Sequence, residues 1–567
     1  MTGVQTCALP ICEFYAPDTE PSLDLAVPLL NITGLDNYNL PHRTSQRKPV
    51  QPSPKGPTPN AASGTNGYVP ADLRNAYVPG TTLTGAGQSV GLMEFSSDNE
   101  SPLGGYYDSD LLAYESEFGL PHISVTTVPV DGGLVTAANS AQRECTMDIE
   151  LVMAMAPGAS IYVFESPSYP NDVLSTMVNY TFIKQFSTSW GLGGGFYTGG
   201  AGSPNPGGDV LLMEMAAQGQ SFFAASGDFD AYESGFQPKD NPPSWEQEST
   251  YATVVGGTVL TMNGSGASYA SETVWNPNPG GVLGGQVGSG GGLSLNYAIP
   301  YWQQGVSMTA NHGSTALRNI PDVAMVASGL DVYSDGADVG LGGGTSASAP
   351  LWAGFMALVN QKAASLGNSS AGFINPAIYA IGQGSGNTPY ASAFHDITTG
   401  NNFWSVSPNN YPAVAGYDLC TGWGTPAIGL INALAGAHQS VVLNTNDSGP
   451  GSLRQAISNA IAGAYAFSDI TFATNLSGAT IHSSGTMTLN GNLTIDASAL
   501  PRGITINGNQ AGSVFFVTNG NVVLTALTIT NGNASASGYG GGILSYAVLT
   551  LNQCTLPEIR PDMQAAL

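Results

Sequence analysis

Two kinds of hydrophobic pattern divide this chain. Between residues 68 and 438, short apolar runs of strand length alternate with segments in which apolar residues recur every three or four positions. Three runs predict buried strands, 89–95, 160–165 and 220–227, and two periodic segments predict helices, 145–155 and 210–218. This alternation predicts an α/β fold with a doubly wound parallel sheet, in which functional residues gather at the carboxyl ends of the strands.

After residue 441 the pattern changes to short strands rich in Thr, Ile and Leu, with Asn-Gly turns between them. The predicted strands are 493–495, 504–506, 522–524, 527–529 and 548–551. Short strands repeated in this way predict stacked β-coils. The segment 441–567, including its opening at 447–454, resembles the start of a right-handed parallel β-helix of bacterial surface and secreted proteins. We expect this all-β domain to be truncated near Leu567.

The first 66 residues carry neither pattern. Residues 1–12 lack the basic and apolar regions of a signal peptide and resemble translated sequencing-adaptor DNA, so they are excluded from the prediction of the fold. An apolar stretch within 13–42 indicates the end of a packed unit. Residues 43–66 are rich in Pro, Ser, Lys and Asn, which is linker composition. We therefore expect the α/β domain to occupy 67–438.

The charge composition indicates the pH range that the protein tolerates and the partners that it can bind. Acidic residues outnumber basic ones 39 to 13, yet only 9% of positions are charged. Protonating the carboxylates would therefore leave no large positive excess to drive the fold apart, and we expect tolerance of acid. The shortage of basic residues argues against a nucleic-acid partner, because phosphates need a basic surface.

Cysteine usage and hydropathy exclude other classes. The five cysteines show no CxxC spacing, so neither a zinc site nor a disulfide-dense scaffold is indicated, and a Cys145–Cys420 pair stays open. The chain contains no run of about 18 apolar residues, so no transmembrane helix is predicted. Abundant Gly, Ser, Thr and Asn with few lysines is typical of an extracellular protein, so we expect secretion.

Ser346 stands in the run 343–350, Gly-Gly-Thr-Ser-Ala-Ser-Ala-Pro, before the helical pattern 351–362, with Pro350 near the first turn of that helix. A serine nucleophile needs a base, which is usually histidine. None of the six histidines stands in a suitable context. A helix N-terminus would favour an alkoxide at Ser346 and a developing oxyanion. The alternative is that Gly-Thr-Ser only caps the helix.

Glu144 and Asp148 lie one helical turn apart, so their carboxyl groups share a face. A solvated surface pair is the alternative reading. If the two are enclosed, repulsion and desolvation raise one pKa and leave a carboxylic acid hydrogen-bonded to a carboxylate. Such a pair could take a proton from Ser346 and return it to a leaving amine.

Asp228 follows a predicted strand within the run Ser-Gly-Asp. A protonated aspartate can donate a hydrogen bond to an oxyanion, which a carboxylate cannot do. The alternative is an ordinary turn residue.

Together these motifs resemble the sedolisins, or serine-carboxyl peptidases, and in particular the kumamolisin-like members, over residues 67–438. Further matching segments are 68–74, 187–191, 254–258 and 290–294. The resemblance implies a subtilisin-like fold with glutamate where subtilisins carry histidine. By the same resemblance Ser346 is the nucleophile, Glu144 the general base and then acid, Asp148 its relay partner and Asp228 the oxyanion donor. Glu94 and Trp190 match positions that extend the proton network.

The resemblance also implies one structural calcium ion. Its ligands would be two carboxylates and three backbone oxygens, from Asp396, Ile397, Val414, Gly416 and Asp418. Oxygen ligands of this kind suit calcium. The family usually has glycine at the position of Val414, but a backbone ligand does not depend on its side chain. Residues 13–42 resemble the tail of the family's pro-domain, which assists folding and blocks the cleft until it is cleaved.

We therefore expect a secreted, monomeric, acid-acting endopeptidase, made as a zymogen, that cleaves protein or peptide substrates through an acyl-enzyme. Its own pro-domain would be a further partner. Two alternatives stay open: a histidine-based subtilase, and a surface adhesin or binding protein whose peptidase unit is inert. The motifs identify neither the bonds that are cut nor the balance of endopeptidase and exopeptidase activity.

Overall fold

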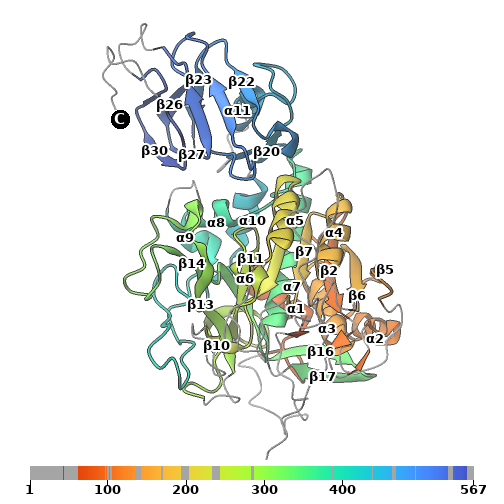
Figure 1. Ribbon diagram of the computed structural model, residues 1–567. Coiled ribbons are helices and arrows are strands. Elements are labelled where there is room, and N and C mark those ends of the chain that lie inside the picture. Colours follow the sequence, from red (N-terminus) through yellow and green to blue (C-terminus); the bar gives the residue numbers. More distant parts are fainter. Residues whose placement is uncertain are drawn as a thin grey trace, which may run out of the picture.

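The computed structural model describes residues 42–43, 62–95, 97–98, 101–102, 105–133, 142–167, 170–192, 204–232, 243–281, 287–341, 343–384, 388–436, 438–462, 468–491, 493–533 and 540–557. The predictions for 1–12, for 13–41 and for most of 43–66 lie outside these residues. Within the described ranges, no helix has the length and hydropathy that a membrane span requires. Figure 1 shows an α/β unit and a smaller β unit.

An eight-stranded sheet forms the centre of the α/β unit, in the order β12-β11-β9-β7-β2-β6-β5, with β15 pairing β11. Neighbouring strands are parallel except for the antiparallel pair β11–β12. The strands are β2 (Ser89–Phe95), β5 (Val125–Pro129), β6 (Ser160–Ser166), β7 (Gln185–Thr188), β9 (Ser221–Ala225), β11 (Thr253–Asn263), β12 (Ser268–Val274) and β15 (Val323–Val326).

Helices cover both faces of this sheet (Figure 1). Val90 and Leu92 of β2 share one core with α3 (Gln142–Met155) and α7 (Thr345–Ser365). Met93 and Phe95, which point the other way, share a second core with α4 (Pro170–Asn179) and α5 (Pro206–Ala217). Successive side chains of a strand point to opposite faces, so one apolar strand serves two helical layers. The predicted doubly wound parallel sheet is confirmed for this unit.

Smaller elements surround the sheet. The other helices of this unit are α1 (Pro70–Tyr77), α2 (Asp108–Phe118), α6 (Trp245–Glu248), α8 (Asn375–Gly382), α9 (Tyr390–Ala393) and α10 (Ile428–Ala435). The other strands are β1 (His42–Arg43), β3 (Ser97–Asp98), β4 (Ser101–Pro102), β8 (Trp190–Gly191), β10 (Phe229–Ala231), β13 (Gly288–Ala298), β14 (Leu317–Ile320), β16 (Leu330–Ser334), β17 (Ala337–Leu341), β18 (Phe394–His395) and β19 (Thr425–Pro426).

Helix α7 begins earlier than its apolar pattern predicts. It starts at Thr345, so Pro350 lies inside the helix rather than near its first turn. Proline has no backbone N–H, so the carbonyl of Ser346, four residues earlier, does not receive the usual helical hydrogen bond from residue 350. That carbonyl accepts a hydrogen bond from the hydroxyl of Ser189 at 3.0 Å. The proline thus opens a polar contact beside the predicted nucleophile.

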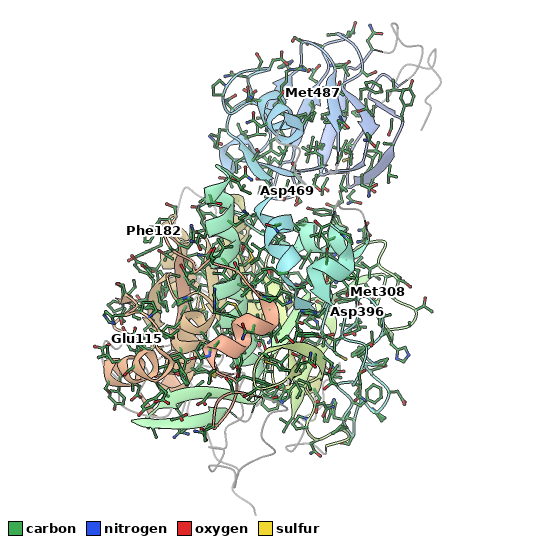
Figure 2. The ribbon with its side chains drawn as sticks, turned by 180° about the vertical axis from the view of Figure 1, so that it is seen from behind. Glu115, Phe182, Met308, Asp396, Asp469 and Met487 are labelled. Atoms are coloured by element: carbon green, nitrogen blue, oxygen red, sulfur yellow. The ribbon has the colours of Figure 1, made fainter. Side chains whose placement is uncertain are left out.

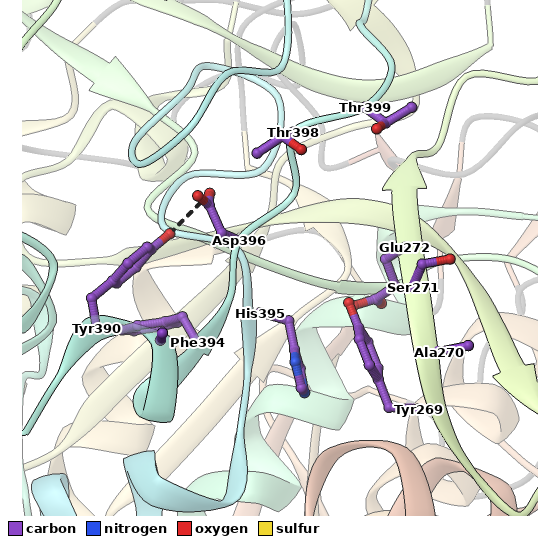
Figure 3. Close-up of a pocket in the computed structure, with 11 residues that line it drawn as sticks. Tyr269, Ala270, Ser271, Glu272, Tyr390, Phe394, His395, Asp396, Thr398 and Thr399 are labelled. Carbon is purple, nitrogen blue, oxygen red and sulfur yellow. Dashed lines mark hydrogen bonds between the residues drawn. The ribbon is translucent and has the colours of Figure 1, made fainter.

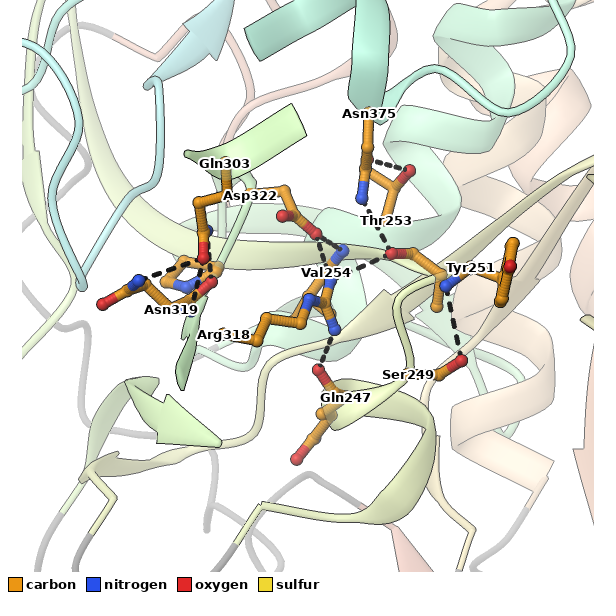
Figure 4. A network of polar contacts seen from close by, with 12 residues as sticks. Gln247, Ser249, Tyr251, Thr253, Val254, Gln303, Arg318, Asn319, Asp322 and Asn375 are labelled. Atoms are coloured by element: carbon orange, nitrogen blue, oxygen red, sulfur yellow. Dashed lines mark hydrogen bonds and ion pairs between the residues drawn. The ribbon is translucent and has the colours of Figure 1, made fainter. Parts of the chain in front are cut away.

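A buried ion pair connects β14 with β11 and α8 (Figure 4). Arg318 and Asp322 are both fully buried and lie 2.7 Å apart. The guanidinium also donates to the carbonyl of Ala252 at 3.0 Å. The carboxylate accepts hydrogen bonds from the Val254 N–H at 2.8 Å and from the Tyr379 hydroxyl at 2.9 Å. Both charges are therefore neutralised and hydrogen-bonded inside the protein.

The C-terminal unit contains three parallel sheets, with the orders β20-β21-β24-β27-β30, β22-β25-β28 and β23-β26-β29. Its elements are β20 (His438–Val442), α11 (Leu453–Ala462), β21 (Ser468–Phe472), β22 (Thr480–His482), β23 (Met487–Asn490), β24 (Leu493–Asp496), β25 (Ile504–Asn507), β26 (Phe515–Asn519), β27 (Asn521–Thr525), β28 (Leu527–Thr530), β29 (Ile543–Ser545) and β30 (Val548–Asn552). The five strands predicted after residue 441 all occur.

This unit has a hydrophobic core of its own, to which Met487 belongs. Figure 2 shows Met487 within the unit and Asp469 where the unit meets the α/β unit. The hydroxyls of Tyr251 and Ser498 lie 3.4 Å apart across this junction.

Cys145 and Cys420 do not pair, and both thiols are free and buried. Cys145 belongs to helix α3, whereas the Cys420 thiol donates to the carbonyl of Tyr411 at 3.0 Å. The structure therefore excludes the disulfide that the sequence left open.

Candidate active site

The predicted catalytic residues are buried on neighbouring elements. Glu144 and Asp148 lie on α3, Ser346 lies on α7, and Asp228 follows β9, with exposed fractions of 4%, 0%, 1% and 0%. Helices α3 and α7 share one core on the same face of the sheet. The reading of Glu144 and Asp148 as a solvated surface pair is therefore wrong.

Ser189 connects the acidic pair to the serine. Its hydroxyl oxygen lies 2.7 Å from Oδ2 of Asp148 and 3.0 Å from the carbonyl oxygen of Ser346. A hydroxyl has one hydrogen, so it can donate to only one of these acceptors at a time. A protonated Asp148 can donate to the Ser189 oxygen and leave the Ser189 hydrogen for the Ser346 carbonyl. The geometry thus accommodates a protonated Asp148.

Electrostatics favour that protonated form. Burial raises the pKa of Asp148 well above its usual range, and the nearby Glu94 and Glu144 raise it further. Taking a carboxylate out of water without a cation is costly, so the group keeps its proton instead. Repulsion between neighbouring carboxylates acts in the same direction, and the group behaves as a shared-proton system.

Glu94 extends the acidic pair toward the end of β2. Its Oε2 accepts a hydrogen bond from Nε1 of Trp190 at 2.9 Å, and the carboxyl is 1% exposed. Burial raises its pKa to about 8, against the hydrogen bonds from Trp190 and Asp148 and with the repulsion of Glu144. The structure therefore places Glu94 and Trp190 beside the carboxyls whose network they were predicted to extend.

Asp228 lies next to the residues that lead into Ser346. Its Oδ1 accepts hydrogen bonds from the N–H of Thr345 at 2.7 Å and from the Thr345 hydroxyl at 2.9 Å. Its buried Oδ2 has no hydrogen-bond partner among the described residues. A Cβ placed on Gly344 would lie 3.0 Å from this oxygen, so glycine leaves room for it. Burial raises the pKa of Asp228 well above its usual range.

A protonated Asp228 can therefore use Oδ2 to donate to an oxyanion formed beside Ser346. Two residues that position the site were not singled out from the sequence, Ser189 and Thr345. Both stand in segments that were recognised as motifs, but a hydroxyl group in a motif does not indicate which buried carboxyl it will contact.

Strand β8 borders this site and pairs with another segment of the chain. The backbone of His42 is opposite Gly191, and that of Arg43 is opposite Trp190, in antiparallel register. From His42 to Arg43 the chain therefore runs along β8 toward Ser189, which contacts both Asp148 and Ser346. An extended backbone fits the edge of β8, as in recognition of a peptide by strand addition.

The segments predicted to bind calcium hold one loop in place. The carboxylate of Asp396 accepts hydrogen bonds from the N–H of Gly416 at 3.0 Å and from the Tyr390 hydroxyl at 3.1 Å. Figure 3 shows Asp396 and Tyr390 beside a cavity of about 470 Å³. His395, beside Asp396, stacks on Tyr269 with ring centroids 3.7 Å apart.

Asp418 accepts more hydrogen bonds than Asp396 does. Its two oxygens accept hydrogen bonds from the N–H groups of Val414, Cys420 and Thr421 and from the Thr421 hydroxyl. Three of these bonds end on Oδ1 and one, from Val414, ends on Oδ2, so Oδ2 keeps acceptor capacity. Within the described ranges no cluster of three or more His, Cys, Asp or Glu side chains could hold a metal ion. The oxygen chemistry suits calcium, and Oδ2 of Asp418, with its single N–H donor, could accept a cation.

No protein-family model matches the chain, but curated relatives do. Kumamolisin from Bacillus sp. (strain MN-32) is 33% identical over 384 residues, which cover 65% of this chain and 63% of kumamolisin. Sedolisin from Pseudomonas sp. (strain 101) is 28% identical over 391 residues, which cover 66% and 62% of the two chains. Xanthomonalisin from Xanthomonas sp. (strain T-22) is 25% identical over 75% of this chain and 54% of its own length. The chain thus spans less than two thirds of the length of these relatives.

A solved structure shares the fold of the α/β unit. Pseudomonas sedolisin, a serine-carboxyl proteinase complexed with two molecules of pseudo-iodotyrostatin, matches with a TM-score of 0.51 and 23% identity. The match covers 66% of this chain and 98% of that structure. The relatives support the sedolisin family for this chain, and the neighbour shows the fold of its α/β part.

Proposed function

We propose that this chain is a serine-carboxyl peptidase of the sedolisin family that hydrolyses peptide bonds through Ser346. One observation carries the proposal: at the start of α7 the Ser189 hydroxyl lies between buried Asp148 and the backbone carbonyl of Ser346, and buried Asp228 accepts hydrogen bonds from Thr345, the residue before Ser346. A histidine-based subtilase is disfavoured, because the site is built from carboxyls. An inert peptidase unit is disfavoured, because the chain keeps all four predicted catalytic residues, Ser346, Glu144, Asp148 and Asp228.

In the proposed mechanism the hydroxyl proton of Ser346 passes to Glu144 while its oxygen attacks the substrate carbonyl. The proton that Asp148 shares with Glu144 lets the pair take up this charge. The protonated Asp228 donates a hydrogen bond to the oxyanion. Glu144 then returns the proton to the leaving amine as the peptide bond breaks. Water attacks the acyl-enzyme, and the same groups transfer its proton in reverse.

This mechanism belongs in acid. Asp228 must hold a proton to donate to an oxyanion, and Asp148 must hold one for the relay. Burial raises both pKa values, so the two protons stay in place across the acid range and are lost as the pH rises. The very low number of basic residues in the chain fits an acidic medium, and we propose a secreted, monomeric enzyme.

The pairing of β1 with β8 supports two further parts of the proposal. It shows the edge strand of the site holding an extended backbone, as an endopeptidase substrate requires. His42 ends the segment that resembles the tail of a pro-domain, and Arg43 begins the predicted linker. We therefore propose a zymogen whose own chain lies in the cleft and is cut between about residues 42 and 67.

The C-terminal unit is proposed to be part of a parallel β-helix, since its strands fall in three parallel sheets around a separate core. A role as a surface or polymer-binding module follows from that resemblance and can coexist with proteolysis. Deletion after Ser440 tests it: unchanged proteolysis with loss of binding would assign binding to this unit.

Structural calcium also stays a proposal, with Asp396 and Asp418 and the backbone oxygens of Ile397, Val414 and Gly416 as its ligands. Bound calcium would brace the loop around residues 414–418 and take no part in proton transfer. If it binds, a chelator lowers the melting temperature and added calcium restores it. An unchanged melting temperature would argue against the site.

The test of the activity is hydrolysis of a denatured protein from about pH 2 to 8 by the purified chain, with Ser346→Ala and Glu144→Gln beside it. We expect hydrolysis in acid by the unsubstituted chain and its loss in both variants. Near-normal hydrolysis by Ser346→Ala would contradict the proposal, and an optimum near or above neutral pH would revive a histidine-based mechanism.

A further inference from the structure

Glu165 is a buried carboxyl beside the relay that the proposed mechanism does not use. It lies near the end of β6, and its Cα is the in-register partner of Glu94 on β2. Residues paired in register on neighbouring parallel strands point to the same face of the sheet. Leu92 and Val163, two residues earlier on each strand, belong to the core that α3 and α7 share. Glu165 and Glu94 therefore face α3 together.

The carboxyl of Glu165 is enclosed without compensation. Its exposed fraction is 0%, and neither oxygen has a hydrogen-bond partner among the described residues. Its backbone is fixed, because the carbonyl accepts the N–H of Val130 at 2.8 Å. Ionising such a group is costly, and burial raises its pKa to about 8. An acid of this kind stays neutral in acid and becomes charged at the alkaline end of the working range.

The groups that face Glu165 are themselves acidic. Burial raises the pKa of Glu94 on β2 most, and the repulsion of Glu144 and, to a lesser extent, of Glu165 adds to that rise. On α3, the Cys145 thiol has its pKa raised by burial and then by Glu94, Glu165, Asp148 and Glu144, so one thiol senses all four carboxyls. Tyr106, just before α2, also has its pKa raised by burial and, to a lesser extent, by Glu165. Strand β5 lies on the other side of β6. Opposite Glu165 it places Pro129, which has no titratable side chain.

We propose that Glu165 is a positioning residue for the catalytic carboxyls Glu94, Asp148 and Glu144. Glu165 makes loss of the relay's shared proton less favourable and extends activity toward higher pH. The inference rests on the proposed function. As the pH rises, negative charge spreads over Glu165 and the relay carboxyls, and each charge opposes the next ionisation. Removing Glu165 removes one of these repulsions, so the relay should lose its proton at lower pH.

The test is the pH profile of Glu165→Gln, which keeps the shape of the side chain and removes its ionisation. We expect the alkaline limb of kcat to move to lower pH by up to about one unit, the scale on which coupled sites interact, with KM unchanged. Glu165→Asp keeps the charge and should largely retain the wild-type limb. An unmoved limb in Glu165→Gln, or an equal shift in Glu165→Asp, would overturn the proposal.

A matched control exists on the same helix as the relay. Glu150 of α3 is also buried, but its Oε2 accepts the N–H of Tyr333 at 2.8 Å, and the acidic groups that raise its pKa, after burial, are Asp110, Asp331 and Asp338. Glu150→Gln should leave the limb in place. A shift equal to that of Glu165→Gln would show a general effect of buried charge and contradict the proposal.

A second measurement separates this inference from the proposed function. Infrared absorption of protonated carboxyl groups follows the buried acids whether or not the chain cleaves peptides. In Glu165→Gln we expect one fewer protonated carboxyl near pH 6, and the remaining buried carboxyls should ionise at lower pH. If the chain proves inactive, the peptidase proposal fails while this titration still decides the coupling: unchanged ionisation of the remaining acids would overturn it.

Discussion

Two groups of buried charge in the α/β unit are neutralised in different ways. Arg318 and Asp322 neutralise each other, and both are hydrogen-bonded to surrounding groups (Figure 4). The carboxyls around Asp148 instead face other carboxyls, and several of their oxygens have no partner in the described part of the chain. A cation balances the first group, and only protons can balance the second.

This difference separates stability from chemistry. Burial raises the pKa of Asp322, but the Arg318 charge and the hydrogen bonds to its carboxylate oppose that rise. Nothing comparable opposes burial at Asp148 except the hydroxyl of Ser189. The ion pair therefore holds β14, β11 and α8 in one arrangement, whereas the carboxyls around Asp148 can exchange protons with a substrate.

The largest effect on hydrolysis should follow from replacing the carboxyl group of Glu144. Glu144→Gln keeps the shape of the side chain but cannot accept the proton of Ser346, so we expect a loss of hydrolysis of roughly 10⁴-fold or more. The melting temperature should stay near that of the unsubstituted chain, since no charge pair is broken. Rate and thermal unfolding, measured together, check this, and retained activity would remove Glu144 from the mechanism.

Breaking the ion pair should give the opposite result. Arg318→Met leaves Asp322 buried and uncompensated, so we expect a loss of about 3–5 kcal/mol in the free energy of unfolding. Denaturant unfolding measures it. The double substitution Arg318→Met with Asp322→Leu removes both charges and should recover part of the loss. A single variant as stable as the parent chain would show that the pair is not a structural element.

The same contrast explains what the sequence could predict. Apolar periodicity located three of the eight strands of the central sheet, β2, β6 and β9, and the helices α3 and α5, because these segments carry the clearest apolar patterns. The motifs located Ser346, Glu144, Asp148 and Asp228, which the fold brings together. Ser189 was not singled out, because its role arises from a contact between β7–β8 and α7. Pro350 was read as a first-turn residue, since the apolar pattern of α7 begins later than the helix does.

Glu165 illustrates the limit from the other side. Alternation within β6 shows only that residue 165 lies on the same face as Val163, which is buried. That a second carboxyl occupies the in-register position on β2 depends on the order of strands in the sheet, which the sequence does not encode locally. Long-range pairing therefore turned two isolated acidic residues into neighbours.

A smaller effect should appear in the dependence of stability on pH. Burial raises the pKa values of Glu94, Glu165 and Glu246 to about 8. Between about pH 4, where unfolded carboxyls titrate, and pH 8, the folded chain binds more protons than the unfolded chain. The free energy of unfolding should therefore fall as the pH rises through this window, with the full cost present above pH 8.

Thermal unfolding from pH 4 to 8 measures that slope, and a melting temperature that rises with pH would contradict it. Arg318→Met sharpens the comparison. Without the cation, Asp322 joins the uncompensated carboxyls, so stability should fall more steeply with pH in this variant. Equal slopes in the two proteins would show that Arg318 does not govern the protonation of Asp322.

The smallest effect should come from Trp190→Phe, which keeps an aromatic ring but removes the donor to Glu94. A hydrogen bond to a charged group contributes about 1.5–3 kcal/mol, which sets an upper bound, and Glu94 is only partly ionised in acid. We therefore expect hydrolysis to fall by no more than about tenfold, because this bond favours the ionised form of Glu94 and its loss should raise the pKa of Glu94.

Trp352→Phe is the matched control for that change. Nε1 of Trp352 donates to the carbonyl of Ala324 at 2.8 Å, away from every carboxyl of the relay. Its loss leaves a buried carbonyl with one bond fewer, so stability should fall while the pH profile keeps its shape. A shifted profile in Trp190→Phe alone would assign the effect to Glu94. If the pH profiles of both variants shift alike, the hydrogen bond of the Trp190 indole only stabilises the structure. Trp190 then belongs with Arg318 and Asp322 among the groups that hold the fold.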